Sequence, residues 1–249
     1  MKVSIITVTC NSANTILTTL NSVKSQTWNS IEHIIIDGNS KDNTLEIVNN
    51  FPHVSKVIAE NDDGIYDAMN KGIENSSGDV IGFLNSDDWF FNDNVIEDIV
   101  NCFRNNKIDA VYGDLVFVVN ENDPHYKRSW KSEDYKKNSF LSGWVPPHPT
   151  FYVKKEIFKK FGVFNIEFKF AADYDLMLRF IEKEKIKTMY MPGPKIKMRL
   201  GGETTKNIKN VILGNMEIFN SLKNNGFKPG ISFWFKKIKY KLKQFSRMS

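Results

Sequence analysis

The first half of the chain alternates short apolar runs with segments of helical pattern, and this alternation limits the possible folds more than any other feature. Runs rich in β-branched and apolar residues predict buried strands at residues 3–9, 32–37, 55–59 and 79–84, with a fifth beginning at 110. Apolar residues at helical spacing lie between them, at residues 13–26, 42–51, 66–75 and 94–103. Strands that alternate with helices predict a mostly parallel sheet with helices on both faces.

After about residue 115 the alternation ends and the pattern becomes mixed. Residues 115–119 and 126–130 resemble a hairpin, and further strands are predicted at 150–153, 187–191 and 196–200. Helices are predicted at residues 155–161, 173–184 and 210–223. Because there is neither an internal repeat nor a clear linker, we expect one continuous domain over residues 1–227, whose smaller second half, from 115, completes a cleft.

The chain is long enough to bury a core without staples. A single α/β domain of 249 residues buries roughly three quarters of its unfolded surface. Two cysteines, Cys10 and Cys102, are too few for a disulfide framework and fit reduced thiols in the cytoplasm. No run of about 18 apolar residues is present and the N-terminus lacks a signal-peptide pattern, so we expect no membrane-spanning segment and no secretion signal.

The C-terminal segment, residues 228–249, is basic and amphipathic. It holds seven of the 34 Lys and Arg residues and none of the 29 Asp and Glu residues, so residues 1–227 carry a formal charge of −2 and we expect no nucleic-acid partner. Its apolar residues fall on one helical stripe: Ile231, Trp234, Phe235, Ile238, Leu242 and Phe245. The pattern is typical of a helix on an anionic membrane surface; a helix packed on the body with solvated lysines is the alternative.

Polar residues follow three predicted strands, at the edge where parallel sheets bind ligands. These segments are Thr9-Cys10-Asn11, Asp37-Gly38-Asn39-Ser40 and Asn85-Ser86-Asp87-Asp88. No glycine-rich dinucleotide or P-loop motif and no zinc-ligand spacing is present. Asp87 and Asp88 suit a Mg²⁺ or Mn²⁺ ion that holds a diphosphate, because these cations prefer carboxylate oxygens. Capping of the following helix is the alternative.

Six segments in order resemble the family 2 glycosyltransferases of the GT-A fold. They are VSIITVTCNSA, IIIDGNSKDNT, ENDDGIYDAMNKGI, DVIGFLNSDDW, HPTFYVKKEIFKKFG and AADYDLMLRF, and they cover about residues 1–185. The resemblance implies an α/β fold of GT-A type, with a mostly parallel nucleotide-binding sheet flanked by helices. Residues 1–114 then form the nucleotide-sugar half, residues 115–227 the acceptor half, and residues 228–249 an amphipathic C-terminal helix.

The resemblance also implies which residues hold the nucleoside-diphosphate sugar. They are Thr7, Thr9, Asn11, Asp37, Asp62, Lys71, Asn85 and Ser86. Asp37 matches the acidic residue that contacts the nucleoside, and Lys71 is expected to neutralise diphosphate charge, with a solvated helix lysine as the alternative. Asn85 stands where the family's D-x-D motif has its first Asp, so one formal charge is lost.

By the same resemblance Asp87 binds a divalent cation, with Asp88 as a second metal or ribose partner, and Asp173 is the catalytic base. Ala172 replaces the usual acidic neighbour of the base, which removes a like charge that would raise the pKa of Asp173. Asp175 is expected to be structural and to pair with Arg179. One base and one displacement predict inversion at the anomeric carbon of the donor.

The Pro-rich segment at residues 143–149 supplies the expected acceptor-side groups, Trp144 and His148. Trp144 suits stacking on a sugar ring, with a core Trp as the alternative, while His148 is left open between a ligand, an acceptor contact and a loop histidine. Residues 201–204 are expected to form a lid over the donor.

The resulting hypothesis is a metal-dependent inverting glycosyltransferase that uses a nucleoside-diphosphate sugar, with UDP favoured by family habit. The acceptor is expected to be a glycan or lipid-linked glycan of bacterial polysaccharide biosynthesis, such as O-antigen or capsule. The basic tail predicts a cytoplasmic protein bound to the inner face of the membrane. The alternatives are a degenerate sugar-nucleotide-binding protein without transfer activity and a nucleotidyltransferase.

Overall fold

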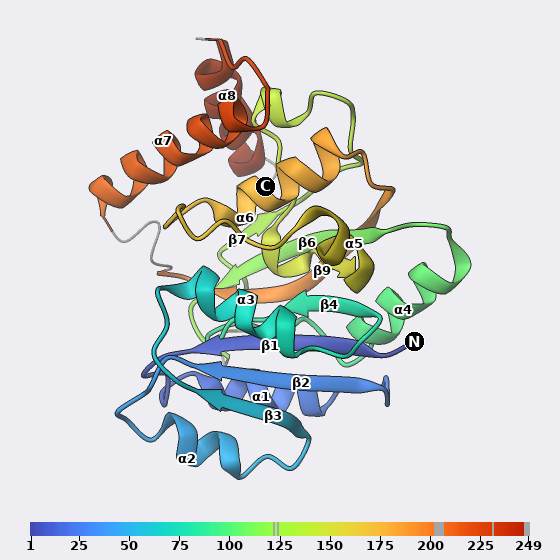
Figure 1. Cartoon of the computed structure of the whole chain (residues 1–249), viewed down its shortest axis with the longest axis vertical. Coiled ribbons are helices and arrows are strands. Elements are labelled where there is room, and N and C mark those ends of the chain that lie inside the picture. Colours follow the sequence, from blue (N-terminus) through green and yellow to red (C-terminus); the bar gives the residue numbers. More distant parts are fainter. Residues whose placement is uncertain (122, 124, 202–206, 231, 247–249) are drawn as a thin grey trace.

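The computed structural model describes residues 1–121, 123, 125–201, 207–230 and 232–246, with side chains up to 242 in the last helix. The expected lid at residues 201–204 and the stripe positions Ile231 and Phe245 therefore lie wholly or mostly outside what is described. Figure 1 shows a twisted central sheet with helices on both faces and the two C-terminal helices at one end.

Within the described residues the sheet has nine strands, in the order β3-β2-β1-β4-β8-β6-β9-β5, with β7 paired to β6. Four strands of the first half run parallel: β1 (Val3–Thr9), β2 (Ile31–Asp37), β3 (Val54–Ala59) and β4 (Val80–Phe83). All four confirm the sequence prediction within two residues at each end. β1, β2 and β4 are buried almost throughout, as continuous apolar runs predict, whereas β3 is largely exposed.

The second half adds strands of both directions. β8 (Tyr152–Lys154) lies antiparallel between β4 and β6 (Ala110–Val118), and β9 (Thr188–Arg199) runs parallel to β6. The short strands β7 (Arg128–Trp130) and β5 (Trp89–Phe90) pair antiparallel with β6 and β9.

Two strand predictions are corrected here. The separate strands expected at 187–191 and 196–200 are one strand, β9, in which the register against β6 shifts beside Asp114. The fifth strand likewise runs on through 115–118, so it is both the continuation of the first half and one arm of the expected hairpin with β7. A bulge in β9 accommodates Pro192 and Gly193.

Helices lie on both faces of the sheet. They are α1 (Ile16–Lys24), α2 (Thr44–Asn49), α3 (Ile65–Asn75), α4 (Val95–Asn105), α5 (Lys155–Phe161), α6 (Ala172–Met177), α7 (Ile208–Asn224) and α8 (Ser232–Ser246). The helix expected at 173–184 continues from α6 as a wider π-helical segment, Leu178–Lys183. Short 3-10 turns occupy Phe140–Ser142 and His148–Thr150.

Alternate residues of each strand enter two separate cores. Ile6 and Ile34 pack with α3, whereas Val3 and Ile5 pack with α4 on the opposite face. Side chains of a strand point alternately to the two faces, so a strand buried along its whole length needs a helix layer on each side. Gly72 lets α3 approach β1 closely, since a Cβ there would lie 2.4 Å from Ile6 Cγ2.

A buried carboxylate joins β1, β2 and the turn before β4. Glu32 accepts hydrogen bonds from Lys2 Nζ at 2.7 Å, Ser4 Oγ at 2.5 Å and Ser77 N at 2.7 Å. Burial raises the pKa of Glu32, but these hydrogen bonds outweigh it and bring the pKa down to about 2. The ionised form is therefore favoured in the folded state.

We expect the Glu32→Gln variant to lose its steep stability decline in acid. Because the folded pKa lies below the ordinary 4.5, the stabilisation is complete above that pH and is lost as the pH falls toward 2, by about 2–3 kcal/mol. Urea unfolding at a series of pH values measures this slope. The exposed Glu74 supplies the control, since Glu74→Gln should follow the wild-type protein; parallel wild-type and Glu32→Gln curves would contradict the assignment.

Candidate active site

The carboxyl ends of β1, β2 and β4 meet at one edge of the sheet, and hydrogen bonds tie their loops together. Asn11 N donates to Ser40 Oγ at 2.7 Å, and the hydroxyls of Ser12 and Ser86 lie 2.9 Å apart. Asn11 and Asn39 both have left-handed backbones, with φ of 51° and 60°. Asn tolerates this region better than most residues, so the tight turns after β1 and β2 keep both loops at the sheet edge.

The loop after β2 is fixed by Asp37. Its side chain is buried, and it accepts hydrogen bonds from Ser40 N at 2.7 Å and Ser40 Oγ at 2.6 Å. Asp37 therefore shapes the turn that carries Ser40 to Asn11. The predicted contact of Asp37 with the nucleoside remains a proposal.

Thr7 and Thr9 differ in their access to this edge. The Thr7 side chain is fully buried, with its hydroxyl 3.0 Å from His33 Nε2, so it lies beneath the predicted site and does not line it. His33 in turn stacks on His53, and burial, with the His53 charge, lowers the pKa of His33 to about 3. Thr9, two residues nearer the edge, has a buried hydroxyl that forms no hydrogen bond among the described residues.

Lys71 is engaged differently from the prediction. Its ammonium lies 2.6 Å from Asp62 Oδ1, 3.0 Å from Glu60 Oε1 and 3.3 Å from Asp67 Oδ2. The hydrogen bonds to these carboxylates, first of all Asp62, raise its pKa above the ordinary lysine value. With its charge neutralised by three carboxylates, Lys71 fastens the loop before α3 and has no free charge for a diphosphate.

The segment after β4 presents two carboxylates at the same edge. Asp88 is buried and receives only long hydrogen bonds, from Arg199 N at 3.3 Å and Asn85 Nδ2 at 3.4 Å. Burial and the neighbouring Asp87 raise the pKa of Asp88 well above its usual range, and burial raises the pKa of Asp87 as well. Asn85 Oδ1 is buried and has no partner within the described part of the chain.

Arg199, at the end of β9, is a site residue that the sequence analysis missed. Its positive charge lowers the pKa of both Asp87 and Asp88, against the effect of burial. The guanidinium packs over Trp89 at 5.4 Å and pairs with Glu121 at 3.0 Å. The signal available in the sequence was only that a predicted strand reaches this residue.

Asp173, the predicted base, lies in the first turn of α6 and is partly exposed. Its Oδ1 accepts hydrogen bonds from Tyr66 OH at 3.2 Å and Tyr174 N at 2.7 Å. Burial and the Asp173 charge raise the pKa of Tyr66 well above the usual value, so the phenol stays protonated and donates. Tyr66 belongs to α3, and this bond therefore joins the two halves of the chain at the base.

His148 lies between Asp173 and the end of β4. Its ring stacks on Phe83 at 5.6 Å and meets the edge of Phe164 at 5.7 Å. Burial lowers the pKa of His148, while the Asp173 charge partly offsets that effect. Phe164 also stacks on Tyr66, which donates to Asp173, so contacts run from the predicted base to Phe83, the last residue of β4.

Trp144 lies in the hydrophobic core, contrary to the prediction of an acceptor contact. Only 2% of it is exposed, and its ring packs against Tyr112, Tyr135 and Phe140 at centroid distances of 5.4–5.8 Å. No face of this ring is free to stack on a sugar, so the core alternative describes it.

The helix α7 fixes the position of α6 from behind. Asp175 accepts hydrogen bonds from Ser221 Oγ at 2.7 Å and Asn225 Nδ2 at 2.9 Å, and lies 3.6 Å from Arg179 Nε. The predicted Asp175–Arg179 ion pair and the structural role of Asp175 are thus present. Of the two acidic residues of α6, only Asp173 remains partly exposed.

Glu217 of α7 holds the segment that leads into α6. Its carboxylate accepts hydrogen bonds from three successive backbone N–H groups, those of Lys169 at 3.0 Å, Phe170 at 2.7 Å and Ala171 at 2.9 Å. These amides come directly before the first turn of α6, which carries Asp173. Nothing in the sequence pattern singles out this contact.

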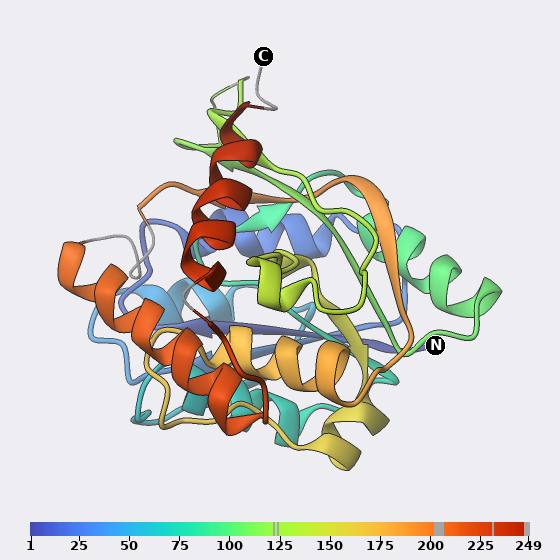
Figure 2. The same ribbon diagram turned by 90° about the horizontal axis from the view of Figure 1, so that it is seen from above.

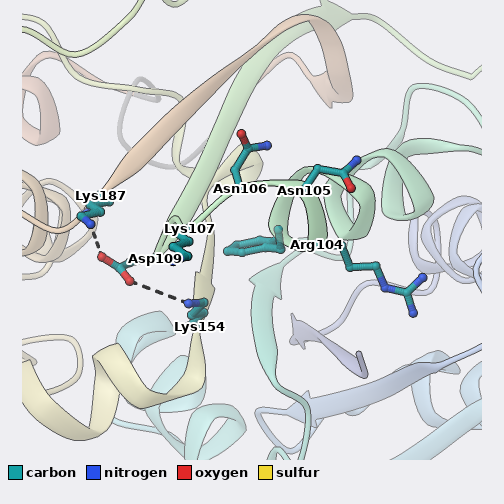
Figure 3. Close-up of a pocket in the computed structure, with 8 residues that line it drawn as sticks. Arg104, Asn105, Asn106, Lys107, Asp109, Lys154 and Lys187 are labelled. Carbon is teal, nitrogen blue, oxygen red and sulfur yellow. Dashed lines mark hydrogen bonds and ion pairs between the residues drawn. The ribbon is translucent and has the colours of Figure 1, made fainter.

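A hollow of about 610 Å³ lies at the opposite edge of the sheet (Figure 3). It is lined by the C-terminal end of α4 and by Asp109, Lys154 and Lys187, next to the start of β6, the end of β8 and the start of β9. Asp109 already pairs with Lys154 and accepts from Lys187 N. Ligands of parallel sheets bind at the carboxyl ends, so this hollow is not part of the candidate site.

The family is decided by comparison with known proteins. The model of the family described as Glycosyl transferase family 2 matches residues 4–164, about two thirds of the chain. This chain is a family 2 glycosyltransferase. The match confirms the resemblance found in the sequence, although it ends before Asp173.

Curated relatives are also named glycosyltransferases. An uncharacterized glycosyltransferase of Mycobacterium tuberculosis is 31% identical over 185 residues, which cover 71% of this glycosyltransferase and 68% of that protein. A PGL/p-HBAD biosynthesis glycosyltransferase of Mycobacterium bovis is 27% identical over 195 residues, covering 76% and 73%.

Solved structures confirm the GT-A fold of this glycosyltransferase. The TarS 1–349 fragment of S. aureus in complex with UDP-GlcNAc matches with a TM-score of 0.70 at 18% identity, covering 92% of this chain and 68% of that one. Mannosyltransferase PcManGT from Pyrobaculum calidifontis, in complex with GDP-Man and Mn²⁺, matches with a TM-score of 0.58 at 17% identity, covering 77% and 55%. The chain spans only 40% of a longer TarS structure.

Proposed function

We propose that this glycosyltransferase moves a sugar, with inversion, from a nucleoside-diphosphate sugar to a hydroxyl of a glycan or lipid-linked glycan. One observation carries the proposal. Asp173 is linked by contacts through Tyr66, Phe164 and Phe83 to the end of β4, and the segment with Asp87 and Asp88 follows that strand. An acceptor base and a diphosphate site therefore face the same edge of the sheet, as a direct displacement requires.

The donor is proposed to lie over the ends of β1, β2 and β4. The unpartnered Thr9 hydroxyl and Asn85 amide oxygen are ready to form hydrogen bonds, and Asn11 and Asp62 flank the same loops. A UDP-sugar is the preferred donor. The UDP-GlcNAc complex of TarS supports this choice. Because PcManGT forms a complex with GDP-Man, GDP-sugars should be tested as donors too.

The residues after β4 fit a divalent cation. Two adjacent carboxylates with raised pKa values and few hydrogen bonds, next to an unpartnered amide oxygen, form a hard oxygen donor set. Across the described residues no cluster of three or more His, Cys, Asp or Glu side chains converges. Mg²⁺ and Mn²⁺ take one or two protein carboxylates and complete their shell with phosphate and water. Asp87, with Asp88, would hold the ion, which stabilises negative charge on a departing diphosphate.

Asp173 is the proposed base. Tyr66 and the Tyr174 amide fix one carboxylate oxygen, which leaves the other free to take the proton of an attacking hydroxyl. His148, beside it, is the proposed acceptor-side group. Arg199 supplies fixed positive charge near the diphosphate end, the role that Lys71 does not fill.

The cellular setting is proposed from the basic tail. Residues 228–249 would hold the protein on the anionic inner face of the cytoplasmic membrane, where lipid-linked acceptors of polysaccharides such as O-antigen or capsule are assembled. In the described part of the chain no helix combines the length and the apolar character needed to cross a bilayer.

A screen of nucleotide sugars tests the proposal. We expect one sugar nucleotide to be hydrolysed slowly, with release of nucleoside diphosphate, and only when Mn²⁺ or Mg²⁺ is present. Consumption of a nucleoside triphosphate with release of pyrophosphate would instead identify a nucleotidyltransferase. Donor binding without any hydrolysis or transfer to oligosaccharide acceptors would identify the degenerate binding protein.

A further inference from the structure

Exposed apolar side chains gather on α7 and α8. Among the described residues, three on each helix are more than half exposed, at spacings that place them on one stripe of that helix: Ile208, Ile212, Met216, Phe235, Ile238 and Leu242. Their exposed fractions run from 55% to 79%. Large apolar side chains exposed singly are common, but stripes of them on two helices that touch at Phe219 and Trp234 call for a partner.

The stripe on α8 faces away from the body because the other side of the helix is packed. Phe233 is only 1% exposed and joins the main core, and Lys237 Nζ donates to Asn215 Oδ1 at 2.6 Å. The helix lies so close to Gly143 that a Cβ there would be 2.4 Å from Lys237 Cα. One side of α8 therefore packs on the body, as in the alternative interpretation of the tail. The other side leaves Phe235, Ile238 and Leu242 exposed.

The stripe on α7 faces away from the body for the same reason. Glu217 and Ser221 bind the start of α6, and Leu222 is fully buried. Phe219, farther along the side that bears the stripe, is already stacked on Trp234 of α8. Ile212 and Met216 therefore lie on the side of α7 that contacts α8, but farther along the helix, where both are exposed.

Both helices lie at the same end of the molecule (Figure 1). Figure 2, which looks down on that end, shows α7 and α8 over the rest of the molecule, joined at the C-terminal end of α7. Both stripes therefore belong to helices at one end of the molecule.

The charge around the stripes favours an anionic bilayer over a second copy of this chain as the partner. The segment from Lys228 onward carries seven basic residues and no acidic one, while residues 1–227 carry −2. The exposed Lys236 and Lys239 lie beside the apolar stripe of α8. A second copy of this chain would bring the same positive charge against it, whereas an anionic bilayer offers both apolar and negative layers.

We propose that α7 and α8 together form a bilayer-docking surface for membranes that contain anionic lipid, with α7 supplying as much apolar contact as the basic tail. The proposal deepens the suggested membrane role of residues 228–249 and adds a second helix to it. Because α7 also holds the start of α6, docking would place the bilayer beside the acceptor side of Asp173. A lipid-linked acceptor fits this placement.

Co-sedimentation with lipid vesicles tests the role of α7. We expect the full chain to bind phosphatidylcholine vesicles that contain phosphatidylglycerol and to bind pure phosphatidylcholine weakly. The double variant Ile212→Ser, Met216→Ser should lower partitioning roughly tenfold, as expected for two apolar side chains withdrawn from the interface. The matched control, Val57→Ser with Met189→Ser, removes two exposed apolar residues on the sheet and should stay within about twofold of wild type.

The outcomes separate the two proposals. If Lys236→Glu with Lys239→Glu abolishes binding while the α7 variant binds like wild type, the tail proposal stands and the role of α7 is wrong. If the chain dimerises in light scattering and the α7 variant is monomeric, a second copy covers this surface and the inference is overturned. Failure of the wild type to bind any vesicle overturns both, while donor hydrolysis tests glycosyl transfer independently. Circular dichroism melting should be unchanged in the α7 variant.

Discussion

Transfer activity is expected to fall by about 10²–10⁴-fold when Asp173 is replaced by Asn, the range of a lost general base. An amide has no basic oxygen for the proton of the attacking hydroxyl, but its carbonyl can still accept the hydrogen bonds from Tyr66 and Tyr174 N. The fold and the donor site should therefore survive. Steady-state transfer rates together with calorimetric donor binding make the measurement, and donor affinity should change by less than about threefold.

Asp175→Asn is the matched control for this prediction. It changes the same atom type two residues away, where the carboxylate accepts from Ser221 and Asn225 and pairs with Arg179. We expect this variant to lower the free energy of unfolding by about 1–3 kcal/mol while it keeps transfer activity at low temperature. The base assignment is wrong if Asp173→Asn retains wild-type transfer, or if both variants lose activity only in proportion to unfolded protein.

Replacing Asp87 by Asn is expected to reduce transfer by about 10²–10⁴-fold, the effect of several kcal/mol of lost charge stabilisation. Unlike the change at Asp173, it should also weaken donor binding, and added Mn²⁺ should restore part of the activity. The physical reason is that an amide oxygen binds a hard cation more weakly than a carboxylate does. Donor titrations at increasing Mn²⁺, with and without a chelator, measure this dependence.

Asp98, exposed on α4, supplies the control for the metal prediction. Asp98→Asn removes one carboxylate of the same type outside the candidate site and should behave as wild type. If the wild-type enzyme is fully active in chelator, or if Asp87→Asn needs no more Mn²⁺ than wild type, the metal role of Asp87 falls. Arg199 would then be the main positive charge near the diphosphate.

The first four strands could be predicted from sequence because each is a local apolar run. Covered by helices on both faces, β1 is buried at every residue, which leaves a continuous signal. The second half depends on contacts distant in sequence. The two residues of β5, Trp89 and Phe90, form a strand only because β9 returns beside them a hundred residues later.

The candidate site divides in the same way. Asp87 and Asp173 lie in local sequence motifs, and their metal and base roles stay predictions. Arg199 and Glu217 act through contacts made by distant segments, so no local pattern reveals them. Trp144 shows the converse: its sequence context next to prolines suggested a binding loop, but three aromatic rings brought by the fold enclose it.

Glu217 connects α7 to the segment that leads into α6 and Asp173. Its carboxylate accepts hydrogen bonds from three consecutive amides, so a tilt of α7 would also move the residues that lead into α6. In the proposed mechanism the sheet positions the leaving group, whereas the Glu217 contact positions Asp173, the proposed base. Small rotations of α7 should consequently alter the turnover number and leave the affinity for the sugar nucleotide nearly constant.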